Sequence, residues 1–378
     1  MAADAPVVRF SASKVALVTG LHEFGDPAEE LLACIYQDRD ELLACDAARL
    51  QLRLVSKADE LEALVCKSGS AAAPQLRAAL RWSSDRATPA RVGAAQRLLA
   101  GVDQRLAEAQ AAKTLGRDEA IETRRLLAEK IHTSVGIRNE RLALQAYERQ
   151  TGSTVRLTNE QFYFLTFPSP PPAADGAVID YRLLDGQSRR TVAPARRSRR
   201  TREATAAVDV DEAQESGGFF SICGMVDGVA DLLTISADDE WTLTPVVVEV
   251  KNRVRSFRSP PPLYDQVQLA VYMKMLGLEQ GDLVQCLYGA STQPAIQVSR
   301  VALDAAPLRD FLSPAASLSE GQSQTEDKDL WTAVIVPRLY AFTAAVQKLR
   351  EEELLRLSFL NGSEEERHVM LRAECEFL

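Results

Sequence analysis

The residues with the clearest chemical potential lie at the end of an apolar run, where the segment 246–251 reads Val-Val-Val-Glu-Val-Lys. A continuous apolar run is typical of a strand buried on both faces. Side chains alternate along a strand, so Glu249 and Lys251 project to one side while Val250 projects to the other. The carboxylate can bind Mg²⁺, and the lysine can orient or activate an attacking water and offset developing negative charge. The pair therefore predicts metal-assisted hydrolysis.

A single Glu-x-Lys pair is a weak signal, because a chain of this size and composition contains about one by chance. A second instance, over 326–328, lies in a polar segment with no apolar run before it. The pair of Glu249 and Lys251 is a stronger signal because of Asp227, which precedes Gly228 between two apolar segments. A hairpin whose return strand runs into 246–250 would bring Asp227 beside Glu249.

Two carboxylates that converge on one point are costly unless a cation binds there. Hard oxygen ligands of this kind suit Mg²⁺, with Mn²⁺ as a substitute. The alternative for Asp227 is a turn residue, because Asp followed by Gly is a common turn sequence. Asp231 is a further candidate that we expect to lie further from the centre.

Three polar side chains could complete such a site. Gln266 and Gln268 stand at the start of a predicted helix, where their amides could hold the nucleophilic water or a phosphate. Glu140 stands near the expected N-terminus of a helix over 139–151 and could bind the metal directly or through water. The alternatives are a polar first helical turn for the glutamines and, for Glu140, an acid favoured by the helix dipole.

The expected start of the first helix combines an arginine with two hydroxyl groups. Arg9, Ser11 and Ser13 stand around this start, where backbone N–H groups are available to bind an anion. Together they predict phosphate binding. The alternative is a helix cap, since serine is a favoured N-cap residue.

The pattern of apolar residues predicts a mixed α/β fold. Helices are expected within 11–50 and over 139–151, 263–276 and 330–357, with a short final helix. Strands are expected over 219–223, 229–235, 243–250, 283–289 and 296–303, and an extended segment over 153–167. Residues 57–131 are rich in Ala, Leu, Glu and Arg and predict further amphipathic helices, whose role is packing.

These elements predict one core with two insertions. The core spans 1–39 and 132–378, and residues 40–131 form a helical insertion. Residues 168–217 open with Pro-Ser-Pro-Pro-Pro and are expected to be a mobile Pro/Arg-rich insertion. They contain seven arginines and no acid over 189–202. This tract fits a nuclear-localisation segment, a nucleic-acid patch or a solvated loop.

The composition excludes several classes of protein. Of 378 residues, 46% are hydrophobic and 26% are charged, with a net charge of −9, which is a globular balance. No apolar stretch approaches the ~18 residues of a membrane span, and the first residues lack a secretory pattern. We therefore expect an intracellular protein with no membrane partner. Six cysteines without a C-x-x-C motif and only three histidines disfavour zinc and iron–sulfur sites.

Taken in chain order, these pieces resemble the PD-(D/E)XK nuclease superfamily, in the branch of bacteriophage lambda exonuclease and YqaJ-type viral recombinases. The matching segments are Ser11-Ala-Ser13, Gly136-Ile-Arg-Asn-Glu140 with Tyr147-Glu-Arg-Gln-Thr-Gly152, Val226-Asp227-Gly228, Glu249-Val-Lys251, Tyr264-Asp-Gln266-Val-Gln268, and Val336-Pro337 in a terminal helix. The resemblance covers about 1–35, 133–165, 218–303 and 328–350. No single motif is specific, but six in the correct order are fairly specific.

The resemblance implies a restriction-endonuclease-like core, in which a mixed central β-sheet is flanked by helices, here with an added α-helical insertion. The roles that it implies are metal binding by Asp227, Glu249, Glu140 and the backbone carbonyl of Val250, and catalysis by Lys251, Gln266 and the same three carboxylates. Gln268 and Tyr272 also fit the Gln-x-x-x-Tyr pattern of RecB-like nucleases, so the nearer relative stays open.

The implied activity is Mg²⁺-dependent hydrolysis of phosphodiester bonds from the ends of duplex DNA, in recombination or repair, with 5′→3′ as one open polarity. The alternatives are a structure-selective endonuclease and a non-catalytic DNA-binding protein with a nuclease fold. The implied partner is DNA, as duplex ends or single-strand junctions. A homo-oligomer and a recombination partner protein both stay open. The arginine tract favours a nuclear location if the host has a nucleus.

Three features depart from the family pattern. Arg9 stands too close to Ser11 to match the family's 5′-phosphate-binding arginine, so the selection of 5′ ends stays open. Val226 replaces the proline that usually precedes the metal-binding aspartate. The insertions 40–131 and 168–217 have no counterpart in the compact phage enzymes.

Overall fold

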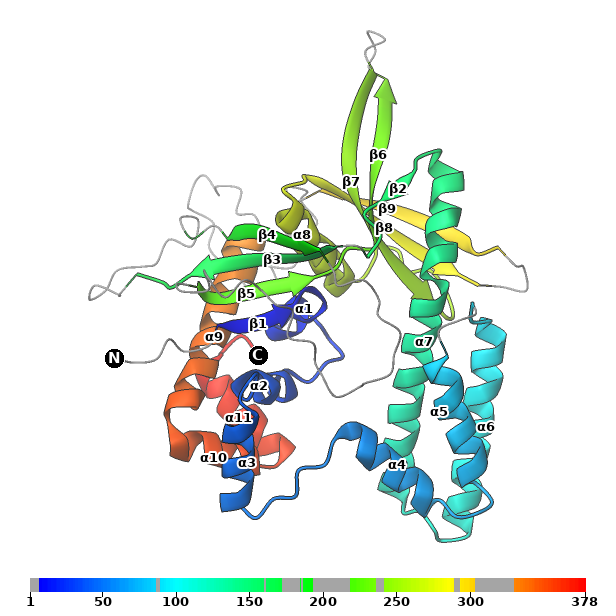
Figure 1. The fold of residues 1–378 in the computed structure, drawn as a ribbon, viewed down its shortest axis with the longest axis vertical. Helices are drawn as coiled ribbons and strands as arrows, with labels where there is room; N and C mark the ends of the chain where they lie inside the picture. Colours follow the sequence, from blue (N-terminus) through cyan, green and yellow to red (C-terminus); the bar gives the residue numbers. More distant parts are fainter. Residues whose placement is uncertain are drawn as a thin grey trace, which may run out of the picture.

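Two mixed β-sheets and several groups of helices form the architecture (Figure 1). The computed structural model describes residues 7–85, 89–159, 161–171, 184, 186–192, 218–235, 241–288, 293–302 and 330–378. The first sheet has the strand order β1-β5-β3-β4 and the second has the order β2-β6-β7-β8-β9. This α/β arrangement is compatible with the expected class, and the nuclease core itself stays a proposal.

Both sheets combine parallel and antiparallel neighbours. The first contains β1 (Val8–Ser11), β3 (Gln161–Pro168), β4 (Gln187–Val192) and β5 (Gly218–Gly224). The second contains β2 (Val155–Arg156), β6 (Gly228–Ile235), β7 (Trp241–Arg253), β8 (Gln280–Leu287) and β9 (Ala295–Ala302). β7 and β8 pair in parallel, and helix α8 (Leu263–Leu276) connects them, because a parallel pair needs a crossover.

The antiparallel hairpin of β6 and β7 confirms the pairing predicted from the sequence. Gly228 lies opposite Val248, and the apolar run that ends at Val248 is fully buried. A Cβ atom on Gly228 would overlap Val155 of β2, so the start of β6 requires glycine for this close approach. The far end of the hairpin projects from the body of the molecule, at the top of Figure 1.

Helices from both ends of the chain pack with the first sheet (Figure 1). They are η1 (Ala12–Lys14), α1 (Val15–Val18), α2 (Pro27–Ile35), α3 (Asp40–Arg49), the π-helical turn η5 (Trp331–Ile335), α9 (Val336–Glu351), α10 (Glu353–Asn361) and α11 (Glu364–Glu374). Phe10 of β1 lies 5.9 Å, between ring centroids, from both Phe220 of β5 and Phe342 of α9. The core therefore joins segments that are far apart in the sequence.

A buried ion pair fixes the N-terminal helices to the C-terminal ones. Arg356 of α10 donates from Nε to Oδ2 of Asp46 in α3 over 2.7 Å, and Tyr36 donates to the same oxygen over 2.9 Å. Both Asp46 and Arg356 are almost fully buried. Removal of one partner would leave an uncompensated buried charge, so this pair is expected to be important for stability.

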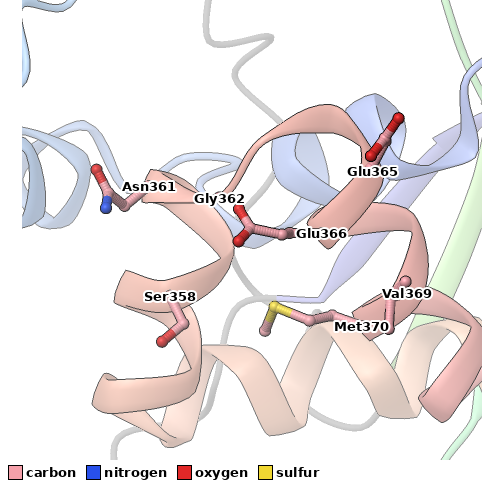
Figure 2. A pocket seen from close by; sticks show the side chains of 7 residues that line it. All are labelled: Ser358, Asn361, Gly362, Glu365, Glu366, Val369 and Met370. Carbon is pink, nitrogen blue, oxygen red and sulfur yellow. The ribbon is translucent and has the colours of Figure 1, made fainter.

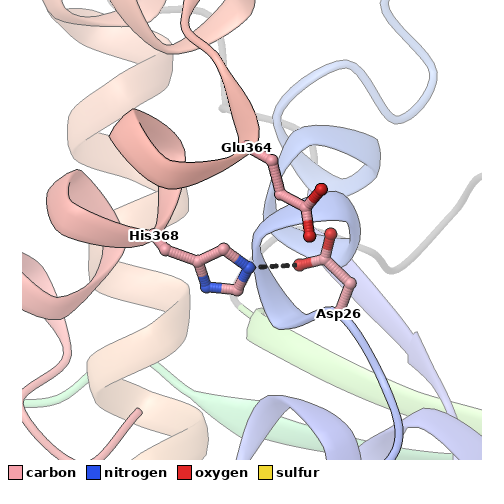
Figure 3. A group of neighbouring side chains, drawn as sticks. All are labelled: Asp26, Glu364 and His368. Carbon is pink, nitrogen blue, oxygen red and sulfur yellow. Dashed lines mark ion pairs between the residues drawn. The ribbon is translucent and has the colours of Figure 1, made fainter.

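A second, more exposed ion pair connects the same two ends of the chain (Figure 3). Nε2 of His368 in α11 lies 3.2 Å from Oδ1 of Asp26, the N-cap residue of α2. Glu364 brings a second carboxylate to within 4.8 Å of both groups. The Asp26 oxygen also accepts hydrogen bonds from two backbone N–H groups of α2. These bonds explain its position as a helix cap, so we assign this group a structural role.

Four further helices form a separate layer with its own apolar core, at the right of Figure 1. They are α4 (Lys57–Lys67), α5 (Ala73–Ser84), α6 (Val92–Ala111) and α7 (Arg117–Thr151). The amide of Asn139 in α7 is fully buried and forms hydrogen bonds with both the N–H and the C=O of Ala90. The packing role expected for 57–131 agrees with this arrangement.

Helix α7 runs without a break from Arg117 to Thr151, across the expected domain boundary at residue 132. The sequence suggested a helix start near Gly136, but a Cβ atom at Gly136 would meet nothing. The glycine neither turns the chain nor ends the helix. Glu140 therefore lies in the interior of a long helix and not near its N-terminus, so the helix-dipole alternative for Glu140 is removed.

Two other expected boundaries also differ. Helix α3 begins at the expected insertion boundary, Asp40, but belongs to the core, because it forms the buried pair with α10. Within 168–217, residues 187–192 form strand β4 at the edge of the first sheet. Most of the expected insertion, including the arginines after 192, lies outside the described residues.

The C-terminal segment 330–357 was expected to be one helix, and it is divided. A π-helical turn precedes α9, and the chain breaks again at Glu352, whose backbone is extended. None of the described helices combines the length and the apolar character that a bilayer crossing requires.

Candidate active site

Asp227 stands at the point where β7 extends beyond its partner strand β6. Gly228 is the first residue of β6, so the β7 edge beyond Val248 has no β6 residue opposite it. The N–H of Val250 at this edge donates instead to Oδ2 of Asp227 over 2.8 Å. The Asp227 carboxylate is therefore fixed to β7, next to the strand residues that carry the expected chemistry.

Glu249 is a buried acid with one engaged oxygen and one orphaned oxygen. Its side chain is 3% exposed, and Oε1 lies 2.9 Å from Nζ of Lys251. Among the described residues, Oε2 of Glu249 is buried and has no hydrogen-bond partner. A buried polar atom without a partner is costly and needs an explanation. A bound cation would supply one.

Glu140 adds a third carboxylate from a third element, α7. Burial raises the pKa of Asp227 well above its usual value, and the negative charges of Glu249 and Glu140 raise it further. Burial also raises the pKa of Glu249, although the Lys251 ammonium opposes this shift. Oε1 of Glu140 accepts a hydrogen bond from the Asn159 amide. Asp227 thus lies within the electrostatic influence of both other predicted acids.

Lys251 lies at the centre of a polar network on the inner side of β7. Its Nζ is 2.7 Å from Oε1 of Gln268 and 3.7 Å from Oδ1 of Asp265. Burial alone would lower the pKa of Lys251, but the charges of Glu249 and Asp265 outweigh burial and raise it. Lys251 is therefore held as an ammonium group in a fixed position.

Asp265 is the residue that the sequence interpretation overlooked. It is 3% exposed and pairs with Arg253 as well as with Lys251. The Nε of Arg253 donates in turn to the buried Oε1 of Gln285 over 2.9 Å. A helical spacing argument could have found Asp265, because residues three apart share one helix face and Gln268 is on the Lys251 face.

The two glutamines of α8 have different environments. Gln268 contacts Lys251 directly, whereas Nε2 of Gln266 donates to the backbone oxygen of Pro261 over 2.7 Å. Successive helix positions differ by about 100° around the axis. Gln266 therefore stabilises the loop that precedes α8, and the structure places Gln268 in the network around the lysine.

The predicted phosphate-binding residues divide in a similar way. The hydroxyl oxygens of Ser11 and Ser13 lie 3.1 Å apart, on a turn whose middle residue, Ala12, lies against Gly224, as Tyr272 does. A Cβ atom on Gly224 would lie 2.8 Å from Cε1 of Tyr272 and 3.2 Å from Cβ of Ala12. Tyr272 in turn contacts Gln268 over 3.5 Å, so the serine turn adjoins the network.

Arg9, the third predicted phosphate-binding residue, contacts Gln37 and Asp38. Its guanidinium forms an ion pair with Asp38, and its side chain is 38% exposed. Its backbone N–H and C=O both bond to the Gln37 amide. Arg9 is thus engaged with the loop after α2.

A cavity of about 570 Å³ lies between α10 and α11 (Figure 2). Its lining includes Ser358, Glu366 and Met370, and it shares no residue with the carboxylate cluster. The Glu366 carboxylate accepts hydrogen bonds from the Ser363 cap of α11, which is a structural role. The cavity is therefore not assigned to the chemistry of the cluster.

Comparisons with protein-family models, with curated proteins and with solved structures found no match for this chain. The function is therefore inferred from the arrangement of the residues themselves. That arrangement is a buried carboxylate, Glu249, with one unsatisfied oxygen, paired with the Lys251 ammonium and accompanied by two partly buried acids, Asp227 and Glu140. Perturbed acids of this kind gather at functional sites more often than at structural ones.

Proposed function

We propose that the protein is a Mg²⁺-dependent deoxyribonuclease of the PD-(D/E)XK type, which hydrolyses phosphodiester bonds from the ends of duplex DNA in recombination or repair. The observation that carries this proposal is Glu249, a buried acid whose Oε1 pairs with Lys251 and whose Oε2 is orphaned. A scaffold protein gains nothing from a buried cluster of like charges, because their desolvation and repulsion oppose folding.

The residue types suit a divalent cation with oxygen ligands. Asp227, Glu249 and Glu140 supply carboxylates, which are the ligands that Mg²⁺ prefers. The N–H and C=O of one strand residue point to the same side, so the carbonyl of Val250 faces the edge where its N–H meets Asp227. A bound Mg²⁺ would polarise the scissile phosphate and lower the pKa of a coordinated water, and Mn²⁺ is expected to substitute.

Lys251 would act by charge and position. Its raised pKa favours the ammonium form, which donates hydrogen bonds but cannot accept a proton. We assign it the role of orienting the water and a phosphoryl oxygen. Gln268 and Asp265 hold its Nζ in place, which limits the reorganisation needed when substrate binds.

The hydroxyls of Ser11 and Ser13 are proposed to bind a DNA phosphate, because their turn adjoins the network through Tyr272 and Gln268. DNA phosphate contacts make binding depend on salt. Binding should therefore weaken as the salt concentration rises. A nuclear location is proposed only through the arginine tract, most of which lies outside the described residues.

The test is digestion of linear duplex DNA, labelled at either the 5′ or the 3′ end, beside a closed circular duplex. Wild type, Lys251→Ala and Asp231→Asn would each be assayed with Mg²⁺, with Mn²⁺ and with EDTA. Asp231 is a matched control, because it lies on β6, the partner strand of β7, but forms an exposed ion pair with Arg156. The label that is released first gives the polarity.

The proposal requires that wild type and Asp231→Asn degrade only linear DNA with metal, and that Lys251→Ala does not. Nicking of the circle would assign an endonuclease with the same site. Binding of DNA without cleavage in either metal would overturn the enzyme proposal and favour a non-catalytic DNA-binding protein.

A further inference from the structure

Three aromatic rings form a row beside the start of α8. His22, in the loop after α1, lies against Tyr264 of α8 with 4.3 Å between ring centroids and 30° between ring planes. The Phe24 ring is perpendicular to the His22 ring, and their centroids lie 6.3 Å apart. The backbone N–H of Phe24 donates to Nδ1 of His22 over 3.1 Å, so the loop itself fixes the orientation of the histidine.

This row is open to solvent at one end. The Phe24 side chain is 69% exposed, which is unusual for a large apolar ring. The adjacent Gly25 is pressed against Leu17 of α1, where a Cβ atom would overlap the leucine. The loop is therefore seated on α1, and the exposure of Phe24 is a consequence of a defined loop conformation.

The row adjoins the candidate active site through α8. Tyr264 immediately precedes Asp265, whose Oδ1 lies 3.7 Å from Nζ of Lys251. The Asp265 charge also acts on His22, although burial prevails and lowers the pKa of the histidine. The exposed Phe24 ring, which stands perpendicular to His22, is thus an uncharged aromatic face. The ring of Tyr264, on which His22 lies, is one residue away from Asp265 in the network that holds the lysine.

We propose that His22, Phe24 and Tyr264 are a stacking platform for one unpaired nucleobase of the DNA substrate. The inference rests on the proposed nuclease function and deepens it, because it specifies a frayed or single-stranded end as the form of DNA that the site binds. Every base has a π-face that can stack on an aromatic side chain. A base within a duplex is already stacked on both faces, so only an unpaired base can use the exposed ring.

The test is a binding titration of the full-length protein with fluorescent DNA in EDTA, where cleavage is absent. The probes are a blunt duplex, the same duplex with a single-stranded thymidine tail, and tails with one abasic position placed in turn along the strand. Phe24→Ala removes the ring, Phe24→Leu retains apolar volume without a π-face, and Phe24→Tyr retains the ring. Trp241→Ala is the control, since Trp241 is a 70% exposed aromatic at the far end of the β6–β7 hairpin.

We expect Phe24→Ala and Phe24→Leu to weaken binding of the tailed duplex by about tenfold, within the range for the loss of one stacked base. Binding of the blunt duplex should be unchanged, and Phe24→Tyr and Trp241→Ala should match wild type. One abasic position should abolish the difference between wild type and Phe24→Ala. Circular dichroism of each variant checks that the fold is retained.

Equal binding of wild type and Phe24→Ala to the tailed duplex would overturn the platform. Binding of the tailed duplex by Phe24→Leu with wild-type affinity would also overturn it, because apolar contact and not stacking would then explain the binding. If wild type cleaves DNA while these variants bind the tailed duplex normally, the stacking proposal is wrong and the nuclease proposal stands. If wild type neither binds nor cleaves DNA, the platform and the nuclease proposal fail together.

Discussion

Nζ of Lys251 lies 2.9 Å from Oε1 of Glu249, two residues earlier on the same strand. The alternation of a strand places both side chains on one face, and the burial of Glu249 makes the pairing necessary, because an isolated buried carboxylate is unstable. The pair uses only one oxygen of the acid. The second oxygen, together with Asp227 and Glu140, leaves excess negative charge that a cation can balance.

The first prediction concerns Asp227→Asn in metal-free protein. The folded pKa of Asp227 is raised above its unfolded value of 3.8, so the folded state binds the proton more tightly than the unfolded state does. The wild type therefore loses stability as the pH rises above about 3.8. The asparagine variant should be more stable at neutral pH, by on the order of 1 kcal/mol, and equal to wild type below the unfolded pKa.

Urea unfolding in EDTA at several pH values measures this effect, and nuclease activity of the same variant should fall about a hundredfold or more. The Val250 N–H can still donate to the amide oxygen of asparagine, so the fold should be retained. If the asparagine variant is less stable than wild type at neutral pH, the charge of Asp227 does not destabilise the folded protein and the prediction is wrong.

The second prediction concerns metal binding without DNA. A ligand that binds only the folded state stabilises it by about 2.7 kcal/mol at a concentration 100-fold above its dissociation constant. Thermal unfolding with increasing Mg²⁺ should therefore show a rising midpoint for wild type and little change for Glu249→Gln. The Asp231→Asn control should respond as wild type does. Equal shifts in all three proteins would place the binding of Mg²⁺ outside the cluster.

The third prediction is that Asp265 is a positioning residue for Lys251. Asp265→Asn removes the charge that pairs with Lys251 and Arg253, while Gln268 still holds the ammonium. We expect kcat to fall about tenfold, which corresponds to roughly 1.4 kcal/mol, with little change in the Kd for DNA. Asp265→Glu should restore part of the rate. A loss of DNA affinity without a loss of kcat would assign Asp265 to substrate binding.

The fourth prediction concerns the buried pair that joins α3 to α10. Burial alone would raise the pKa of Asp46, but hydrogen bonds from Arg356 and Tyr36 outweigh burial and lower it. The stabilisation is therefore present above the unfolded pKa of 3.8 and is lost as the pH falls through the folded value. Asp46→Asn should cost about 3–5 kcal/mol at neutral pH, because it leaves Arg356 buried without its charge partner.

Denaturant unfolding at neutral and strongly acidic pH tests the fourth prediction. The difference between Asp46→Asn and wild type should shrink on acidification. A matched substitution in the exposed pair of Lys348 and Glu374 should change stability by less than about 1 kcal/mol. A pH-independent loss for Asp46→Asn would point to lost packing and not to lost charge.

The strands of the candidate site could be predicted because their signals are local. The valine run of β7 and the Asp227-Gly228 step define a hairpin without knowledge of the rest of the chain, and the observed register confirms it. Helix α8 begins and ends at the predicted residues, Leu263 and Leu276. Local pattern and tertiary structure agree at these points.

Features that depend on distant contacts could not be predicted. Gly136 is unfavourable in a helix by propensity, yet α7 is continuous through it, with Ile131 and Val135 packed in the core of the helical layer. Asp46 and Arg356 are too far apart in the sequence for any spacing rule. The different orientations of Gln266 and Gln268 depend on where the Pro261 carbonyl lies, which a single sequence does not reveal.

The continuity of α7 has a mechanical consequence. Its 35 residues make a rod of roughly 50 Å, with Glu140 in one half and the packing surface for α4, α5 and α6 largely in the other. A tilt imposed at the Arg117 end would move Glu140 relative to the β-sheet that carries Asp227 and Glu249. Ala143, Leu144 and Tyr147 of the same helix pack against β7, so one continuous helix joins the packing of α4–α6 to the strand that carries Glu249.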